Sequence, residues 1–171
     1  LLVMASILEK EASKLSDRKK IAGVLWHRIA IGMPLQVDAV FPYIMGKNTF
    51  LAAQQYGYFP FPDALDVVIS NQNIENKWRD KVIITNKSPK DILSMLSEKG
   101  FETAFLAGGG QLNSSFMKDG LVDEIYLDVE PLVFGNGIQV FDKADFEFEL
   151  KLLEVNKLNS DTVQLHYKVL K

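Results

Sequence analysis

The chain has 171 residues, of which 47% are apolar and 24% charged, and its formal charge at pH 7 is -3. This length accommodates one full core and is too short for two ordinary domains. The acidic balance argues against a protein that coats nucleic acid, because neutralising phosphates needs a clustered lysine and arginine surface. The sequence contains no cysteine, which excludes disulfides, thiolate metal sites and a cysteine nucleophile.

The apolar run at the start of the chain is too short to span a bilayer. It covers residues 1–8 and is followed at once by charged residues, whereas a spanning helix needs about 20 apolar residues. We therefore expect a soluble, cytoplasmic chain that acts on a small-molecule substrate, with neither nucleic acid nor a membrane as partner. The chain lacks an initiator methionine, so the presence of a segment before Leu1 stays open. Whether the chain forms a homodimer stays open as well.

The first third of the chain predicts two helices. Apolar residues recur at spacings of three and four over residues 7–15 and 21–29, which is the pattern of an amphipathic helix. Gly32 and Pro34 then predict the end of the second helix. Residues 36–50 show no clear period.

Short apolar runs alternate with helical stretches from residue 46 onward. Branched-aliphatic runs at Asp66–Ile69 and Val82–Thr85 predict buried strands, and Ser88 is a suitable cap for the helix that follows. A third run, residues 103–107, leads directly into three glycines, residues 108–110, and a further helix. This order of strand, glycine turn and helix is typical of a nucleotide-binding crossover.

The last third of the chain predicts more strands. Residues 125–129 form one apolar run, and residues 146–152 and 163–169 alternate between apolar and polar side chains. The predicted fold class is therefore α/β, with a mostly parallel sheet, a C-terminal antiparallel pair and a helical N-terminal segment.

Three loops of this predicted sheet have the composition of a phosphate site. The glycines 108–110 expose backbone N–H groups at a helix N-terminus, where a phosphate is favoured. Gly46 opens another helix beside Lys47, and Ser70 follows a strand. Because ligands of open α/β sheets bind at the carboxyl ends of the strands, the loops predict a dinucleotide site. Tight glycine turns without a ligand are the open alternative.

The order and spacing of these motifs resemble the dihydrofolate-reductase-like superfamily, in particular the reductase domain of the bifunctional riboflavin-biosynthesis deaminase-reductase. The stretches that carry the resemblance are residues 45–50, 61–70, 108–112, 120–127 and 131–137. The resemblance implies a three-layer reductase domain over residues 45–171. It also implies NADPH as hydride donor for a pteridine-like or ribosylamino-pyrimidine substrate.

The same resemblance implies a set of cofactor-binding positions and no metal. These positions are Gly46, Lys47, Thr49, Ser70, Asn71, Gly108, Gly109, Gly110, Gln111 and Leu112. Lys47 stands where the family usually has arginine, which keeps the charge but loses the bidentate geometry. Glu130 falls near the family's substrate region, and a solvated glutamate at a strand end is the alternative.

Residues 1–44 resemble a different family, the endolytic lytic transglycosylases of bacterial cell-wall synthesis. The stretches that match are residues 4–12, 17–18, 21–24, 28 and 31–38. The resemblance implies that Glu11 protonates the glycosidic oxygen and that Gln36 and Asp38 line the cleft. A solvated helix face is the alternative for residues 9–11.

The chain therefore reads as a hybrid whose halves meet near residues 45–49. The reductase family normally begins with a central strand that carries the substrate-side wall, and residues 1–44 are not expected to replace it. We expect weak NADPH binding and little reductase turnover, with glycan cleavage by Glu11 or an inactive hybrid as the alternatives. His27 and His166 have no second ligand at useful spacing, so both are predicted to be structural.

Overall fold

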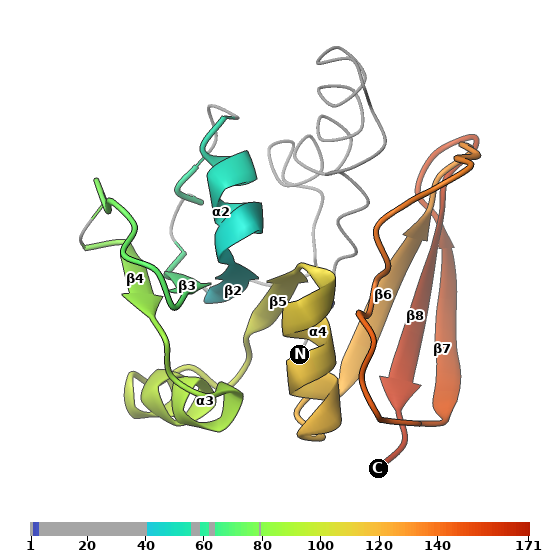
Figure 1. Ribbon diagram of the computed structural model, residues 1–171. Helices are drawn as coiled ribbons and strands as arrows, with labels where there is room; N and C mark the ends of the chain where they lie inside the picture. The colour runs from blue at the N-terminus through green and yellow to red at the C-terminus, as the bar shows by residue number, and fades with distance from the viewer. Residues whose placement is uncertain (1, 4–40, 56–58, 62–63, 79) are drawn as a thin grey trace.

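The computed structural model describes residues 2–3, 41–55, 59–61, 64–78 and 80–171. Within these residues the chain forms two sheets, with helices packed beside the larger one (Figure 1). The larger sheet is parallel and has the order β1-β5-β2-β3-β4, and the smaller is antiparallel with the order β6-β8-β7. The predicted α/β class, mostly parallel sheet and antiparallel C-terminal strands are therefore all present.

The parallel sheet is built from short buried strands. Its members are β1 (Leu2–Val3), β5 (Phe105–Gly108), β2 (Tyr43–Gly46), β3 (Asp66–Ile69) and β4 (Val82–Thr85). The bounds of β3 and β4 are those predicted from their branched-aliphatic runs. β2 lies in the stretch without a clear period, because a strand covered on both faces shows no alternation of polar and apolar residues.

Alternate side chains of the central strands enter two different cores. On β2, Ile44 packs in the cluster that includes Leu96 and Phe116, whereas Met45 packs in the cluster that includes Phe50. The first cluster joins the sheet to α3 (Pro89–Glu98) and α4 (Gly110–Lys118), and the second joins it to α2 (Lys47–Ala53). Both faces of the sheet are thus covered, which makes three layers.

Helix α3 begins where its sequence predicts. The backbone N–H of Asp91 donates to the Ser88 side chain at 3.3 Å, and Pro89 occupies the first helical position. The helix ends before Gly100, whose φ of +88° is favourable for glycine alone among the common residues. None of the helices in the described part of the chain has both the length and the hydropathy of a membrane span.

The two N-terminal residues that the structure describes correct one expectation. Leu2 and Val3 form β1, which pairs in parallel with Phe105 and Leu106 of β5 and also contacts β6. The N-terminal segment therefore does contribute a strand beside β5. The predicted N-terminal helices, together with Glu11, Gln36, Asp38 and His27, lie outside the described residues.

The antiparallel sheet consists of β6 (Glu124–Val129), β8 (Val163–Val169) and β7 (Leu150–Lys157). β7 begins later than the predicted run 146–152, because Phe146 and Phe148 pack against the core from the preceding segment.

His166, on β8, lies 2.9 Å from Glu124 and stacks on Tyr126. The described residues contain no group of side chains suited to hold a metal ion.

Candidate functional site

The sheet brings three predicted loops to one place. β2 lies between β5 and β3, so the carboxyl ends of these three strands are neighbours. β5 leads into α4, β2 leads into α2, and β3 leads into the Ser70 turn. The loops line a pocket of about 860 Å³. Its lining is Gly46, Lys47, Asn48, Thr49, Ile69, Ser70, Asn71, Gln72, Gly109, Gly110, Gln111, Leu112, Ser115, Gly137, Ile138, Gln139 and Asp142.

Most of the predicted site residues that the structure describes line this pocket, and two do not. Gly108 is the one predicted cofactor position absent from the lining, and its carbonyl lies 3.8 Å from where a Cβ on Gly46 would stand. Glu130 is also outside the lining and accepts a hydrogen bond from the Thr162 hydroxyl at 2.8 Å. The pocket therefore gathers nine of the ten positions predicted for the cofactor, but neither Gly108 nor Glu130.

The N-terminus of α4 faces this pocket, whose lining also includes the acidic residue Asp142 from a later segment of the chain. Gly109 is the N-cap residue and makes no side-chain cap, and the first turn contains no acidic residue. A Cβ on Gly109 would lie 3.9 Å from the Thr49 hydroxyl, so α2 and α4 approach each other closely here. Free N–H groups and the helix dipole make such an end favourable for an anion.

A cation lies at the rim of the pocket. The Lys47 ammonium donates a 2.6 Å hydrogen bond to the side-chain carbonyl of Gln72. The backbone of Gln72 is held in a tight turn by the Ser70 hydroxyl. This hydroxyl accepts from the backbone N–H of Gln72 and donates to its backbone carbonyl, both at 3.0 Å. Sequence reasoning missed Gln72, although it follows the predicted Ser70 and Asn71 directly.

A further wall comes from the segment 137–142, which sequence reasoning also missed. This segment is held on α4 by two buried side chains. The Asn113 amide donates to the Val140 carbonyl at 2.7 Å, and the Ser114 hydroxyl donates to the Asp142 carbonyl at 2.8 Å. The wall is more than twenty residues away in sequence, so no local pattern connects it with the glycine turn.

Gly110 is where this wall meets the helix. Its carbonyl accepts from the Asp142 N–H at 3.2 Å. A Cβ on Gly110 would lie only 2.7 Å from the Gln139 carbonyl oxygen and 3.2 Å from the Asp142 nitrogen. Both neighbours are backbone atoms that cannot rotate away, so the close approach requires glycine at this position.

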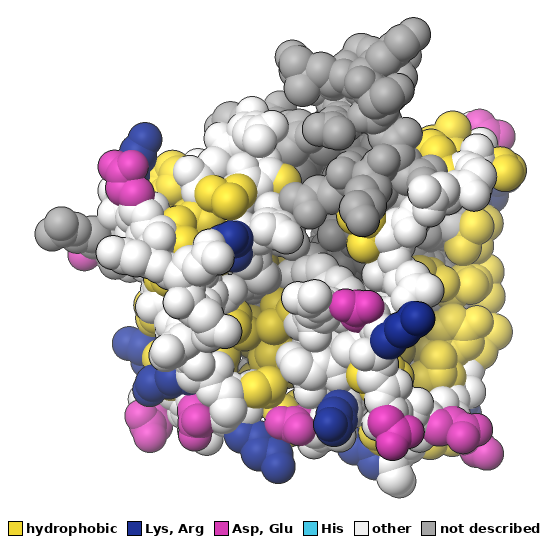
Figure 2. Space-filling model, in the orientation of Figure 1, with side chains coloured by type: hydrophobic (Ala, Val, Ile, Leu, Met, Phe, Trp, Pro, Cys, Tyr) yellow, Lys and Arg dark blue, Asp and Glu magenta, His cyan; other side chains and the backbone are white. Residues whose placement is uncertain are grey.

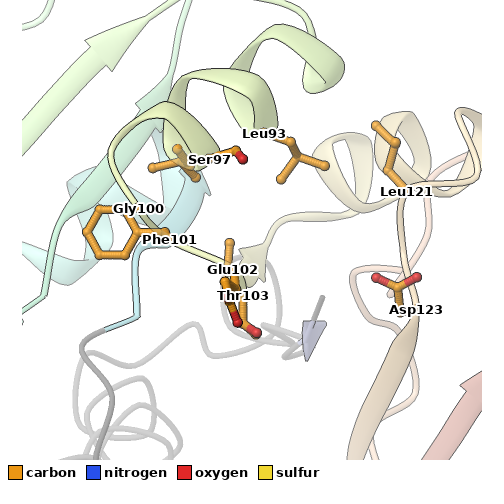
Figure 3. Close-up of a pocket in the computed structure, with 10 residues that line it drawn as sticks. Leu93, Ser97, Gly100, Phe101, Glu102, Thr103, Leu121 and Asp123 are labelled. Atoms are coloured by element: carbon orange, nitrogen blue, oxygen red, sulfur yellow. The ribbon is translucent and has the colours of Figure 1, made fainter.

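A second pocket, of about 480 Å³, lies at the opposite end of the strands. Figure 3 shows its lining side chains from α3, from the segment before β5 and from the segment before β6. Asp123 at its edge is paired with the Lys171 ammonium at 2.6 Å. The pocket contains none of the predicted site residues and lies away from the carboxyl edge where ligands of such sheets bind.

Comparisons with known proteins agree with both resemblances. The profile of the RibD C-terminal domain matches residues 59–164, and that of the YceG-like family matches residues 1–59. YwjB of Bacillus subtilis is 29% identical over 133 residues, which cover 77% of this chain and 73% of that protein. The endolytic murein transglycosylase of Bacillus subtilis is 48% identical over 48 residues, which cover 28% of this chain but only 13% of that protein.

The fold has solved counterparts. A crystal structure from Shewanella sp. PV-4, described as a riboflavin biosynthesis protein, has a TM-score of 0.69 and 23% identity. The matched region covers 81% of this chain and 83% of the Shewanella chain. The predicted dihydrofolate-reductase-like fold is thereby confirmed, as are the two resemblances that make the chain a hybrid. Because the profile match over residues 59–164 takes in more than half of the sequence, the chain belongs to the family of RibD C-terminal domains.

Proposed function

We propose that the chain binds NADPH in the pocket at the carboxyl edge of the sheet. We further propose that it is a reductase of a ribosylamino-pyrimidine or pteridine-like substrate, of the riboflavin-biosynthesis type. The main support for the proposal is that Lys47, the Ser70 turn and the N-terminus of α4 all line the same pocket. Family membership supports the same reading.

The residues present fit this dinucleotide. The pocket volume of about 860 Å³ is within the usual range of roughly 300–1,000 Å³ for ligand sites. Gly109 has no side chain that would keep a pyrophosphate from the free N–H groups of α4, and Lys47 with Ser70 would face the 2′-phosphate. Asp142 would repel a phosphate but can accept hydrogen bonds from ribose hydroxyls.

NADPH, when bound, supplies a hydride to the substrate. The chain's own contribution is to orient the cofactor and keep water away, because transfer needs the reacting atoms about 3–3.5 Å apart. We expect low turnover, since residues 1–44 stand where the family has its first strand and are not expected to supply the substrate-side wall. The assay is NADPH oxidation with a ribosylamino-pyrimidine, and rapid oxidation by the unmodified chain would contradict this expectation.

Replacing Lys47 by methionine is expected to weaken NADPH binding about tenfold, which corresponds to about 1.4 kcal/mol. Binding of NADH should change less, because NADH lacks the 2′-phosphate. Trp78 packs against Phe50 on the helix that carries Lys47, so quenching of tryptophan fluorescence reports the titration. Lys99→Met is the control, because Lys99 is exposed at the far end of α3. Equal affinities of the Lys47 variant and the parent for NADPH would contradict the proposed role.

A second candidate function is cleavage of peptidoglycan by Glu11. The match of residues 1–59 to the YceG-like family favours it, and a single general acid is sufficient for this chemistry because the sugar can supply its own nucleophile. The identity covers only 13% of the murein transglycosylase, so most of that enzyme has no counterpart in the matched segment. Release of muropeptides that is lost in Glu11→Gln would support this function over the reductase.

A further inference from the structure

The second pocket lies between the ends of two helices, at the amino edge of the parallel sheet. Its volume is about 480 Å³, and it is bordered by Ser97 and Gly100 at the end of α3 and by Leu121, which follows α4. A helix C-terminus has a partial negative charge, because its last carbonyl groups have no partner within the helix. The cofactor pocket lies at the N-terminus of α4 and favours an anion, so the second pocket has the opposite preference.

Tight turns hold these two helix ends in place. After α3, the N–H of Gly100 donates to the Ser97 carbonyl at 2.9 Å. After α4, the N–H of Leu121 donates to the Phe116 carbonyl at 3.0 Å. Gly100 and Gly120 adopt φ values of +88° and +67°, which are typical of the turn that ends a helix. The walls of the pocket are therefore fixed before a ligand arrives.

The lining combines an apolar wall with acidic side chains. Leu93, Phe101 and Leu121 are partly buried and pack against the core of the sheet. The charged residues of the lining are Glu102 and Asp123, and both are acidic. Figure 3 shows the apolar side chains and the Asp123 carboxylate around the same space. An occupant that matches this lining has an apolar part and a positive charge.

The two carboxylates differ in their partners. Asp123 binds the Lys171 ammonium at 2.6 Å, which shows that a carboxylate at this place pairs with an alkylammonium group. Glu102 is exposed and forms no hydrogen bond or ion pair with any residue that the structure describes. Glu102 is therefore the carboxylate available to a ligand.

The lysines at the two helix ends lie outside the lining. Lys99 is the C-cap of α3 and Lys118 is in the last turn of α4, and neither lines the pocket. Figure 2 shows charged side chains of both signs along the lower edge of the molecule, where Figure 1 places α3 and the end of α4. The rim is therefore hydrated, and salt screens part of its attraction for a cation. We expect the apolar wall to supply most of the affinity and the charge to set the selectivity.

We propose that the second pocket binds a small organic ammonium compound. The apolar part of the ligand would lie against Leu93, Phe101 and Leu121, and its ammonium group would face Glu102 and the helix C-termini. The volume of about 480 Å³ is within the range of roughly 300–1,000 Å³ that is typical of ligand sites. No described residue lines both pockets, so the proposal stands or falls independently of NADPH binding.

Amide chemical-shift mapping with phenethylammonium tests the site on the labelled full chain. We expect saturable shifts at residues 100–104 and 121–123 with a dissociation constant of about 1 mM, because only one apolar ring is buried. Phenylacetate has a similar size and the opposite charge, and we expect it to bind at least about tenfold more weakly. Equal binding of the two probes, shifts at other places only, or no shifts at about 10 mM phenethylammonium would overturn the proposal.

Glu102→Gln and Glu102→Lys test the role of the carboxylate. Glu102 is exposed, so neither substitution should disturb the fold. Removing the charge is expected to weaken phenethylammonium binding about threefold, and reversing the charge should abolish the preference for phenethylammonium over phenylacetate. Glu98→Gln is the matched control, because Glu98 is exposed on α3 and outside the lining. If Glu102→Lys kept the preference of the parent chain, recognition of the ammonium group by this carboxylate would be refuted.

Discussion

Replacement of Gly110 by alanine is expected to weaken NADPH binding at least about tenfold and to lower the free energy of unfolding by about 2 kcal/mol. The added Cβ would lie 2.7 Å from the Gln139 carbonyl oxygen and 3.2 Å from the Asp142 nitrogen. Both atoms are backbone, so the segment 137–142 must shift away from α4. That shift opens the wall of the pocket and strains the hydrogen bond from Asp142 to Gly110. Urea unfolding and an NADPH titration on the same preparation measure the two effects.

Gly135→Ala is the matched control for this substitution. A Cβ on Gly135 would meet nothing within 4 Å, and Gly135 is outside the pocket lining. We expect its stability to stay within about 0.5 kcal/mol of the parent. If Gly110→Ala bound NADPH as tightly as Gly135→Ala, the close contact between α4 and the segment 137–142 would not shape the cofactor site.

Asp66, at the amino end of β3, is expected to make the free energy of unfolding depend strongly on pH. Its carboxyl group is fully buried, and one oxygen accepts a 3.3 Å hydrogen bond from the Phe61 N–H. The other oxygen has no hydrogen-bond partner among the described residues. Burial raises the pKa of Asp66 to about 7, with the Phe61 hydrogen bond opposing the rise. The folded protein therefore holds this proton more tightly than the unfolded chain, whose Asp pKa is about 3.9.

The sign of the pH dependence follows from that difference. The stabilising contribution of protonated Asp66 is complete below pH of about 4, declines as the pH rises, and is gone above the folded pKa of about 7. Three pKa units correspond to about 4 kcal/mol as an upper bound. Asp66→Asn keeps the shape without the ionisation, so its stability should decline less between pH 4 and pH 8, by up to that amount.

Urea unfolding of the parent and of Asp66→Asn at pH 4, 5, 6, 7 and 8 measures this effect. Asp80→Asn is the control, because Asp80 is exposed and its substitution should leave the pH profile of the parent unchanged. Parallel profiles for the parent and Asp66→Asn would mean that Asp66 is ionised at no cost in the folded protein.

The elements that could be predicted from the sequence are those whose signal is local. The branched-aliphatic runs of β3 and β4 mark buried strands, and Ser88 with Pro89 marks the start of α3. The three glycines 108–110, where β5 passes into α4, and the glycine before α2 indicate the turns that lead into the pocket. These features depend on a few neighbouring residues and need no tertiary partner.

The elements that could not be predicted depend on partners distant in sequence. β2 has only four residues and is covered on both faces, so its side chains carry no alternation. The pairing of β1 with β5 joins the beginning of the chain to residues more than a hundred positions later. The wall formed by the segment 137–142 depends on the buried side chains of Asn113 and Ser114 and on the absence of a side chain at Gly110. No local sequence pattern in α4 or in the segment 137–142 shows that the two are in contact.

Amide chemical-shift mapping of the labelled full chain with NADPH tests whether the pocket at the carboxyl edge of the sheet binds a dinucleotide. We predict saturable shifts that cluster at four places: residues 46–49, 70–72, 109–112 and 137–139. Residues around the second pocket, such as Phe101 and Leu121, should not shift. Saturation is expected even for the weak binding proposed here, because about 2 mM NADPH exceeds a submillimolar dissociation constant. Shifts confined to other parts of the chain, or none at that concentration, would contradict the assignment of this pocket to a dinucleotide.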